Sequence, residues 1–160
     1  MRLSIISVGR LKNGPERELV ERYRQRLEAS GRSLGFTAIN QIELSESKAR
    51  REEDRRAEEA AAISAKLGNG VLVAFDERGK SLSSKAFSDQ ITNWRDSGRE
   101  QASFIIGGAD GLDETLRQKA DLILSFGALT LPHQLVRVLV TEQLYRAITI
   151  IGGHPYHRDG

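Results

Sequence analysis

The side chains that could take part in acid–base chemistry gather near the end of the chain. They are His133, Arg137, His154, Tyr156 and His157. Imidazole and phenol groups exchange protons with substrates, and a guanidinium group can stabilise a developing negative charge. Tyr156 and His157 stand out, because they place two titratable groups on a short tail behind an apolar stretch. The alternatives are a frayed tail without a role and, for His133 beside a proline, a structural function.

A glycine-rich segment could bring a flat ligand close to the backbone. Gly107-Gly108-Ala109-Asp110-Gly111 follows one predicted strand and precedes a predicted helix. This G-G-x-x-G pattern differs from the dinucleotide fingerprint G-x-G-x-x-G, and the chain has no P-loop, so a phosphate cradle is not supported. Glycines here still permit close approach of a ligand. The alternative is a tight turn alone.

Three segments stand at the carboxyl ends of predicted strands: Phe75, Gly107 and residues 126–131. In a parallel sheet these ends lie along one edge, which is where open α/β sheets bind ligands. Together they would form a pocket with apolar walls and main-chain donors and acceptors. Such a pocket suits an adenine ring.

These strand ends belong to an alternating pattern of strands and helices. Apolar and β-branched runs predict strands at residues 2–8, 37–44, 71–75, 102–107 and 121–126. Helical spacing, caps and prolines predict helices at residues 15–30, 45–67, 85–96, 113–119 and 132–151. The alternation predicts an α/β fold, a three-layer sandwich with a mostly parallel sheet.

The last predicted helix has almost no polar surface. A helix that is apolar nearly all round is buried, and in a chain of this size it also suggests a subunit interface. A narrow polar stripe is formed by Gln134, Arg137, Thr141 and Tyr145, and Glu142 and Arg146 make an opposite-charge pair four residues apart. The stripe fits either hydrogen bonding in an interface or a role toward a substrate.

Length and composition limit the classes of function. The chain has 160 residues, so we predict a single domain over residues 1–160. With no cysteine and only three histidines it offers neither disulfides nor a zinc cluster, so no metal site is expected. The first residues are too quickly charged for a signal peptide and no apolar run approaches membrane-spanning length, which predicts a cytoplasmic protein. The net charge of +2 permits an anionic partner without requiring one.

Several stretches resemble the RlmH family of SPOUT-class methyltransferases. They are DERGK at residues 76–80, IGGADG at 106–111, LTLPHQLVRVL at 129–139, EQLYRA at 142–147 and the dipeptide YH at 156–157. The resemblance covers the whole chain. It implies transfer of a methyl group from S-adenosylmethionine to N3 of pseudouridine 1915 in 23S ribosomal RNA of the ribosome.

The resemblance also implies an architecture and a cofactor site. Members have a parallel sheet between helices and a trefoil knot in the C-terminal part, and they act as homodimers. By matching motifs, the S-adenosylmethionine contacts would be Phe75, Gly107, Phe126, Gly127, Ala128, Leu129, Thr130 and Leu131. Family members commonly carry leucine where this chain has Phe75, so this chain departs from the pattern but keeps an apolar wall.

The implied reaction needs the N3–H proton of pseudouridine to be removed. We hypothesise that Tyr156 and His157, together with Arg137, form the substrate side of the site, either in the same chain or against the cofactor of a partner subunit. Phosphate contacts would come from Arg10, Lys12, Lys48, Arg50, Arg51, Arg55 and Arg56. For residues 48–56 the alternative is a solvated helix face, because acidic residues interleave the basic ones. Two other functions stay open: methylation of another RNA, and a non-catalytic, ribosome-associated binding module.

Overall fold

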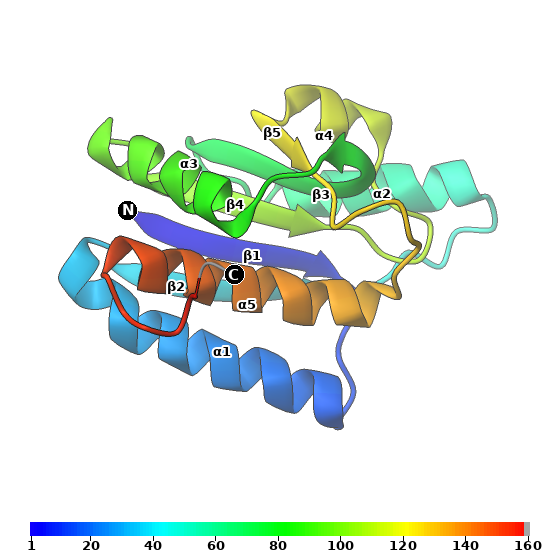
Figure 1. Ribbon diagram of the computed structural model, residues 1–160. Helices are drawn as coiled ribbons and strands as arrows, with labels where there is room; N and C mark the ends of the chain where they lie inside the picture. Colours follow the sequence, from blue (N-terminus) through cyan, green and yellow to red (C-terminus); the bar gives the residue numbers. More distant parts are fainter. Residues whose placement is uncertain (159–160) are drawn as a thin grey trace.

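A five-stranded, all-parallel sheet forms the centre of the molecule. The computed structural model describes residues 1–158. The strands are β1 (Arg2–Val8), β2 (Ala38–Leu44), β3 (Val71–Lys80), β4 (Gln101–Ile106) and β5 (Leu122–Leu124). Their order across the sheet is β2-β1-β4-β3-β5 (Figure 1). The predicted parallel α/β architecture is therefore confirmed.

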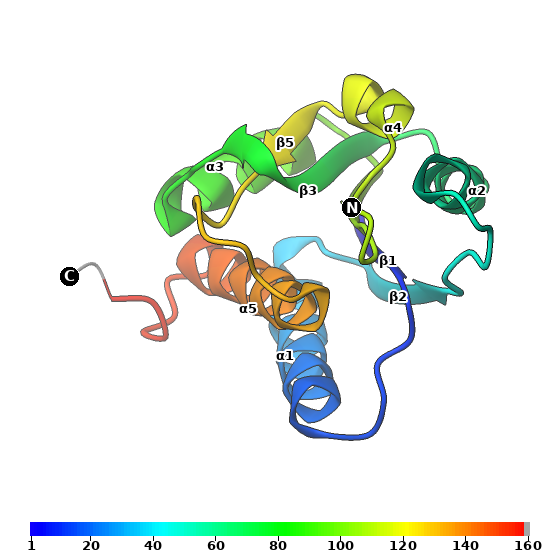
Figure 2. The same cartoon turned by 90° about the vertical axis from the view of Figure 1, so that its right-hand side faces the viewer.

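Helices cover both faces of this sheet. They are α1 (Pro15–Gly31), α2 (Glu52–Ser64), α3 (Ser84–Asp96), α4 (Glu114–Lys119) and α5 (His133–Ile151), with a short 3₁₀ helix η1 (Arg32–Leu34) after α1. Helices α1, α3 and α5 pack on one face, and α2 and α4 lie on the other (Figure 2). The result is the three-layer sandwich that the alternating pattern predicts.

The strands separate two cores by simple alternation of side chains. In β3, Val73 points into the core with α1, α3 and α5, whereas Leu72 and Ala74 point into the core with α2 and α4. The same alternation places Phe104 and Ile105 of β4 on opposite faces. Strands buried on both faces read as continuous apolar runs, which is why these strands were visible in the sequence.

The predicted helix over residues 45–67 is wrong in its first third. The structure begins α2 at Glu52, and residues 45–51 run beside the helix without helical structure. Ser47 explains the difference, because its backbone N–H donates to Glu59 Oε1 (3.4 Å) and its Oγ accepts from Ala49 N (3.1 Å). Side-chain bonds of this kind compete with the helical hydrogen-bond pattern.

Strand β3 is longer than the apolar run that predicts it. After Phe75 the register shifts, and Lys80 then pairs with Leu124 of β5. A Cβ atom placed on Gly79 would lie 2.6 Å from the backbone carbon of Leu124, so the two strands can approach this closely only with glycine there. Because residues 76–80 (DERGK) are mostly polar, the sequence pattern does not predict this second pairing.

None of the helices within residues 1–158 combines the length and the apolar character needed to cross a membrane. The knot implied by the family resemblance stays a prediction, as does the single-domain assignment.

Candidate functional site

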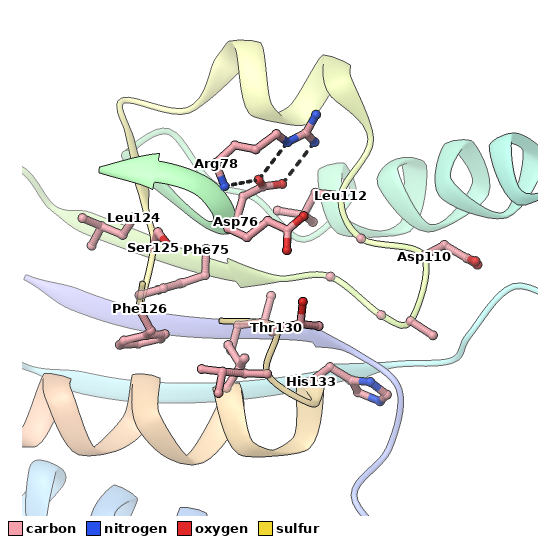
Figure 3. A pocket seen from close by; sticks show the side chains of 18 of the residues that line it. Phe75, Asp76, Arg78, Asp110, Leu112, Leu124, Ser125, Phe126, Thr130 and His133 are labelled. Atoms are coloured by element: carbon pink, nitrogen blue, oxygen red, sulfur yellow. Dashed lines mark hydrogen bonds and ion pairs between the residues drawn. The ribbon is translucent and has the colours of Figure 1, made fainter. Parts of the chain in front are cut away.

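A cavity of about 650 Å³ lies at the carboxyl edge of the sheet (Figure 3). The ends of β3, β4 and β5 and the start of α5 surround it. Its volume falls within the roughly 300–1,000 Å³ of small-molecule sites in proteins. The strand ends that the sequence analysis brought together therefore do form one pocket.

Two aromatic rings make the apolar wall of the cavity. Phe75 and Phe126 stack with ring centroids 5.3 Å apart and planes 10° apart. Phe75 is buried, whereas Phe126 keeps 39% of its surface exposed. The same pair borders a smaller cavity of about 250 Å³, which Leu82 and Phe87 also line. The stack therefore separates two hollows and offers apolar surface to both.

The glycine-rich segment after β4 forms a tightly closed loop along the cavity. Gly108 and Gly111 pair in a short antiparallel bridge, with Gly111 N donating to Gly108 O at 3.0 Å. A Cβ atom on Gly107 would lie 2.7 Å from the backbone carbon of Gly111, so no larger residue fits without moving the loop. The loop therefore presents main chain, rather than side chains, to whatever occupies the cavity.

Most of the predicted cofactor residues line this cavity. Seven of the eight do so, namely Phe75, Gly107, Phe126, Gly127, Leu129, Thr130 and Leu131. Ala128 lies in the same loop but is not among the lining residues. Leu129 is 82% exposed, which is unusual for so large an apolar side chain and leaves it available to a ligand or a partner.

Asp76 is a half-buried residue at the rim of the cavity, and its side chain is only 8% exposed. The sequence motif DERGK contains it but gave it no role. Its carboxylate accepts from Arg78 N (2.9 Å) and Arg78 Nε (3.1 Å), as Figure 3 shows. Arg117 Nε lies 3.3 Å from the same carboxylate. Burial alone would raise the pKa of Asp76, but the hydrogen bonds from Arg78 and the charge of Arg117 outweigh burial and lower it. Asp76 is thus an ionised anchor at the point where the register of β3 shifts after Phe75.

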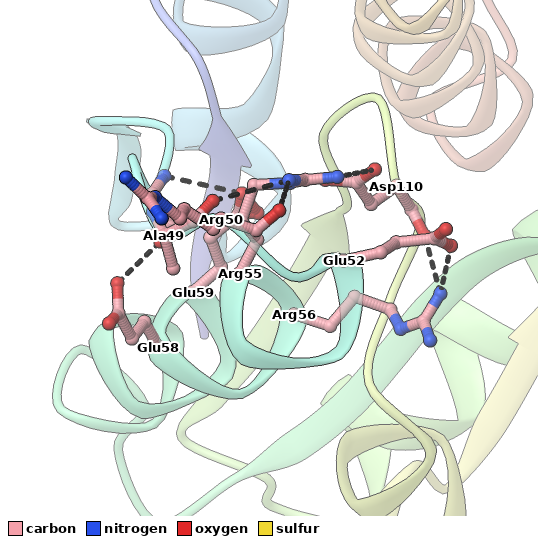
Figure 4. A network of polar contacts seen from close by, with 9 residues as sticks. Ala49, Arg50, Glu52, Arg55, Arg56, Glu58, Glu59 and Asp110 are labelled. Atoms are coloured by element: carbon pink, nitrogen blue, oxygen red, sulfur yellow. Dashed lines mark hydrogen bonds and ion pairs between the residues drawn. The ribbon is translucent and has the colours of Figure 1, made fainter.

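Helix α2 binds the glycine loop, residues 107–111, through an arginine side chain (Figure 4). Arg55 Nε donates to Asp110 Oδ2 at 2.6 Å and Arg55 Nη2 donates to Asp110 Oδ1 at 3.1 Å, and this pairing lowers the pKa of Asp110. Arg56 lines the cavity and donates to Glu52. Arg51 donates to Glu53 at 3.4 Å, so at least three of the seven predicted phosphate contacts are engaged with acidic groups of the chain itself.

Arg137 lies away from this cavity. It is only 2% exposed, and its Nη1 donates to Gly9 O at 3.0 Å while its Nη2 donates to Glu43 Oε2 at 2.5 Å. It lines a separate hollow of about 120 Å³ beside α1. Burial would raise the pKa of Glu43, but the Leu11 N–H and Arg137 outweigh burial and lower it.

The tail residues pack on the middle of α5. Tyr156 donates from its hydroxyl to Glu142 Oε1 (3.0 Å), and its ring centroid lies 4.7 Å from that of Tyr145. Arg146 places its guanidinium carbon 4.8 Å from the centre of the Tyr156 ring and its Nη1 3.2 Å from His157 Nδ1. The arginine that lies with the tail is therefore Arg146, which the sequence analysis noted only as the partner of Glu142.

The two remaining histidines differ in their positions. His133 begins α5 and lines the cavity, with its Nε2 4.0 Å from Glu46 Oε1. His154 is exposed, and its Nδ1 accepts from Tyr156 N at 3.1 Å. Tyr156 and His157 are not among the residues lining the cavity, so within the described residues of one chain the tail and the cavity are separate.

Comparisons with known proteins bear on this geometry. Residues 1–157 match the family model described as a predicted SPOUT methyltransferase. A protein from Methylobacterium nodulans is 57% identical over 159 residues, which is 99% of this chain and 98% of that protein. A protein from Rhodopseudomonas palustris (strain HaA2) is 58% identical over 159 residues, 99% of each chain. Both carry the name ribosomal RNA large subunit methyltransferase H.

The fold also has a counterpart among solved structures. A probable methylase family protein from Haemophilus influenzae superposes with a TM-score of 0.50 at 11% identity, covering 99% of this chain and 70% of that one. At so low an identity the superposition supports the fold and nothing beyond it.

Proposed function

The chain belongs to the SPOUT methyltransferase family and, within it, to the ribosomal RNA large subunit methyltransferase H family, and from this membership we propose that it methylates ribosomal RNA. The methyl donor is S-adenosylmethionine, and the acceptor is N3 of pseudouridine 1915 in 23S rRNA. The enzyme works as a homodimer on ribosomes in the cytoplasm.

The cavity at the carboxyl edge of the sheet is the observation that carries this proposal. It combines the size of a nucleoside site, an aromatic wall and a loop that exposes main chain. An adenine ring binds well where apolar side chains contact its faces and main-chain groups form hydrogen bonds with its edge. When bound, S-adenosylmethionine supplies a methyl group that is already activated on a sulfonium sulfur.

The chain's own residues orient the cofactor and exclude water. Phe75 and Phe126 cover one apolar side, while Gly107 and the loop from Gly127 to Leu131 surround the rest. Holding two reactants in line replaces an encounter in solution, and this effect is worth several kcal/mol of the barrier, up to about 7–11 in well-oriented cases. The bridge between Gly108 and Gly111 closes the loop beside the cavity and so helps to hold it in position for this task.

The tail on α5 supplies the proton chemistry. Burial, then the hydrogen-bonded neighbours Tyr23 and Glu142, raise the pKa of Tyr156, so its hydroxyl stays protonated at neutral pH and donates to Glu142. Arg146 can only donate, so it occupies the lone pair of His157 Nδ1 in the free protein. The substrate displaces Arg146 from the ring; His157 Nδ1 then takes the N3 proton, and the released cationic Arg146 stabilises the anionic base. Arg137 does not contact the substrate in this scheme. Its hydrogen bonds to Gly9 O and Glu43 Oε2 hold the ends of β1 and β2 in position. Because the tail and the cavity are separate in one chain, the tail of the partner subunit completes the site.

Labelled methyl transfer tests the proposal. Ribosomes that lack the modification, naked 23S rRNA and free tRNA are each incubated with the protein and methyl-labelled S-adenosylmethionine, and the digested nucleosides are identified by mass spectrometry. We expect N3-methylpseudouridine from ribosomes alone. Label in tRNA would favour the second function, methylation of another RNA. No label in any RNA, with no binding of S-adenosylhomocysteine, would leave the non-catalytic binding module.

A further inference from the structure

Glu59 is a buried carboxyl group for which the catalytic scheme has no use. It lies on the inner side of α2, next to the core residue Ala60 and one turn before the core residue Ile63, and it is only 6% exposed. Its Oε1 accepts from Ser47 N at 3.4 Å. Its Oε2 is buried and has no hydrogen-bond partner anywhere in residues 1–158. An ionised oxygen in that situation loses its hydration without compensation.

This orphaned oxygen lies against the back of the glycine loop. A Cβ atom on Gly108 would come within 3.6 Å of Glu59 Oε2 and within 3.0 Å of Val8 Cγ1, so Gly108 is held between the two side chains. Gly108 in turn pairs with Gly111, and both line the cavity on their other side. One turn earlier on α2, Arg55 binds Asp110 of the same loop (Figure 4). Helix α2 thus supports the loop at two points.

The charges that face Glu59 favour its protonated form. Burial is the largest influence and raises its pKa, and the negative charges of Asp110 in the loop and Glu46 in the segment before α2 raise it further. Two influences lower the pKa of Glu59 without outweighing the others: the hydrogen bond from Ser47 N–H and the charge of Arg55, which Asp110 already engages. Val8, which packs against Gly108 from β1, carries no charge.

We propose that Glu59 is a positioning residue that holds the glycine loop in its cofactor-binding form while its carboxyl group is protonated. Ionisation places an uncompensated charge against Gly108, which is relieved only if the helix and the loop separate and let water in. The cofactor, which needs the closed loop, binds more weakly as a result. This inference rests on the proposed function, because the loop matters only if the cavity takes S-adenosylmethionine.

Calorimetric titration with S-adenosylhomocysteine at pH 6, 7, 8 and 9 tests it, on the full-length protein and on Glu59→Gln. Glutamine keeps the shape of the side chain but cannot ionise. At each pH the dissociation constant of the wild type is divided by that of Glu59→Gln. We expect this ratio to increase by about fivefold or more from pH 6 to pH 9, because fivefold is the usual lower limit of coupling between sites. Dividing the two constants removes any titration of the ligand itself.

A matched variant and a second measurement control for other causes of a pH dependence. Glu53→Gln changes an exposed carboxylate on the same helix and should follow the wild type at every pH. Repeating the titration in buffers of different ionisation enthalpy measures protons taken up on binding. By linkage, the wild type should take up a proton above the pKa of Glu59 and Glu59→Gln should not. The wild-type measurement needs no variant to fold.

Parallel pH profiles and equal proton uptake in the wild type and Glu59→Gln would overturn the inference while leaving the proposed function intact. Absence of binding by every variant at every pH would overturn both.

Discussion

Gly107 is the residue at which the site tolerates the least change. Its hypothetical Cβ would meet backbone atoms of Gly111 at 2.7 and 2.9 Å, and backbone cannot turn aside as a flexible side chain can. Gly107 is predicted as a site residue by its position at a strand end. The contact of the loop with Gly111 is not predictable from the sequence, because it depends on the bridge between Gly108 and Gly111.

Gly107→Ala should therefore weaken binding of S-adenosylhomocysteine by at least about tenfold, measured by calorimetry, because the loop must move to make room. Gly98→Ala is the control. Gly98 has a φ of +80° and nothing within 4 Å of a Cβ, so alanine should cost about 1 kcal/mol of stability and leave binding unchanged. Unchanged binding by Gly107→Ala would remove the loop from the cofactor site.

The aromatic wall makes a second prediction at this scale. Phe126→Ala removes the partner of Phe75, and aromatic pairs contribute about 0.5–1.5 kcal/mol beyond the area they bury. We expect S-adenosylhomocysteine to bind about three- to tenfold more weakly, and Phe126→Leu to recover part of the loss. Leu82→Ala alters an equally exposed apolar residue of the smaller cavity and should have no effect. Equal losses in Phe126→Ala and Leu82→Ala would contradict a specific role for the stack.

Asp76 connects pH to stability. Because its pKa is lowered in the folded protein, its contribution is fully present above the ordinary pKa of about 3.8 and is lost as the pH falls through the lowered value. Asp76→Asn should reduce the free energy of unfolding in urea by about 1–3 kcal/mol at pH 7, since Arg78 loses its charged acceptor and Arg117 keeps only Glu114 as an acidic partner. The difference should shrink below pH 4. A difference that is the same at pH 3 and pH 7 would show that charge at Asp76 is not the cause.

At the scale of elements, the sequence predicts regular structure well where burial dictates the pattern. All five strands and all five helices occur near their expected places, because apolar runs and helical spacing follow from a sheet covered on both faces. Residues 45–51 and the end of β3 were misjudged because hydrogen bonds from distant partners decide them: Ser47 to Glu59 in one case and Lys80 to β5 in the other. The sequence likewise does not predict that the tail packs on α5, nor that Arg146 lies beside Tyr156 and His157.

The contact between the tail and α5 predicts a separation of binding from turnover. His157→Ala and Tyr156→Phe should each lower methyl transfer, because one loses the proton acceptor and the other loses the hydrogen bond to Glu142 that orients the tail. General acid–base catalysis is worth about 100- to 10,000-fold, so His157→Ala should show the larger loss. Binding of S-adenosylhomocysteine should be unchanged in both. His154→Ala, on the exposed side of the tail, is the matched control. Full turnover in both variants would end the catalytic assignment.

At the scale of the whole molecule, large apolar side chains are exposed around the mouth of the site. Phe126, Leu129 and Leu135 are 39%, 82% and 42% exposed, and all belong to the loop before α5 or to its first turns. A second subunit over this region would bury them and bring its tail to the cavity. The sequence indicated such an interface from the apolar character of the last helix, although nine of its 19 residues prove to be buried within the chain itself.

Leu135→Glu should consequently shift the protein from dimer to monomer in analytical ultracentrifugation, because a charge in an apolar interface is not compensated. The monomer should lose methyl transfer, since the tail can no longer reach the site. Leu82→Glu changes an exposed apolar position on the smaller cavity, outside helix α5, and should stay dimeric. An active Leu135→Glu monomer would show that one chain suffices.

The most direct measurement for the central claim, that main-chain loops at the sheet edge hold the methyl donor, is a crystal structure with S-adenosylhomocysteine. We expect the adenine ring in the cavity, between the loop from Gly107 to Gly111 and the loop from Phe126 to Leu131, with the sulfur directed toward the tail of the partner subunit. Electron density for the ligand at another place on the molecule would contradict the account.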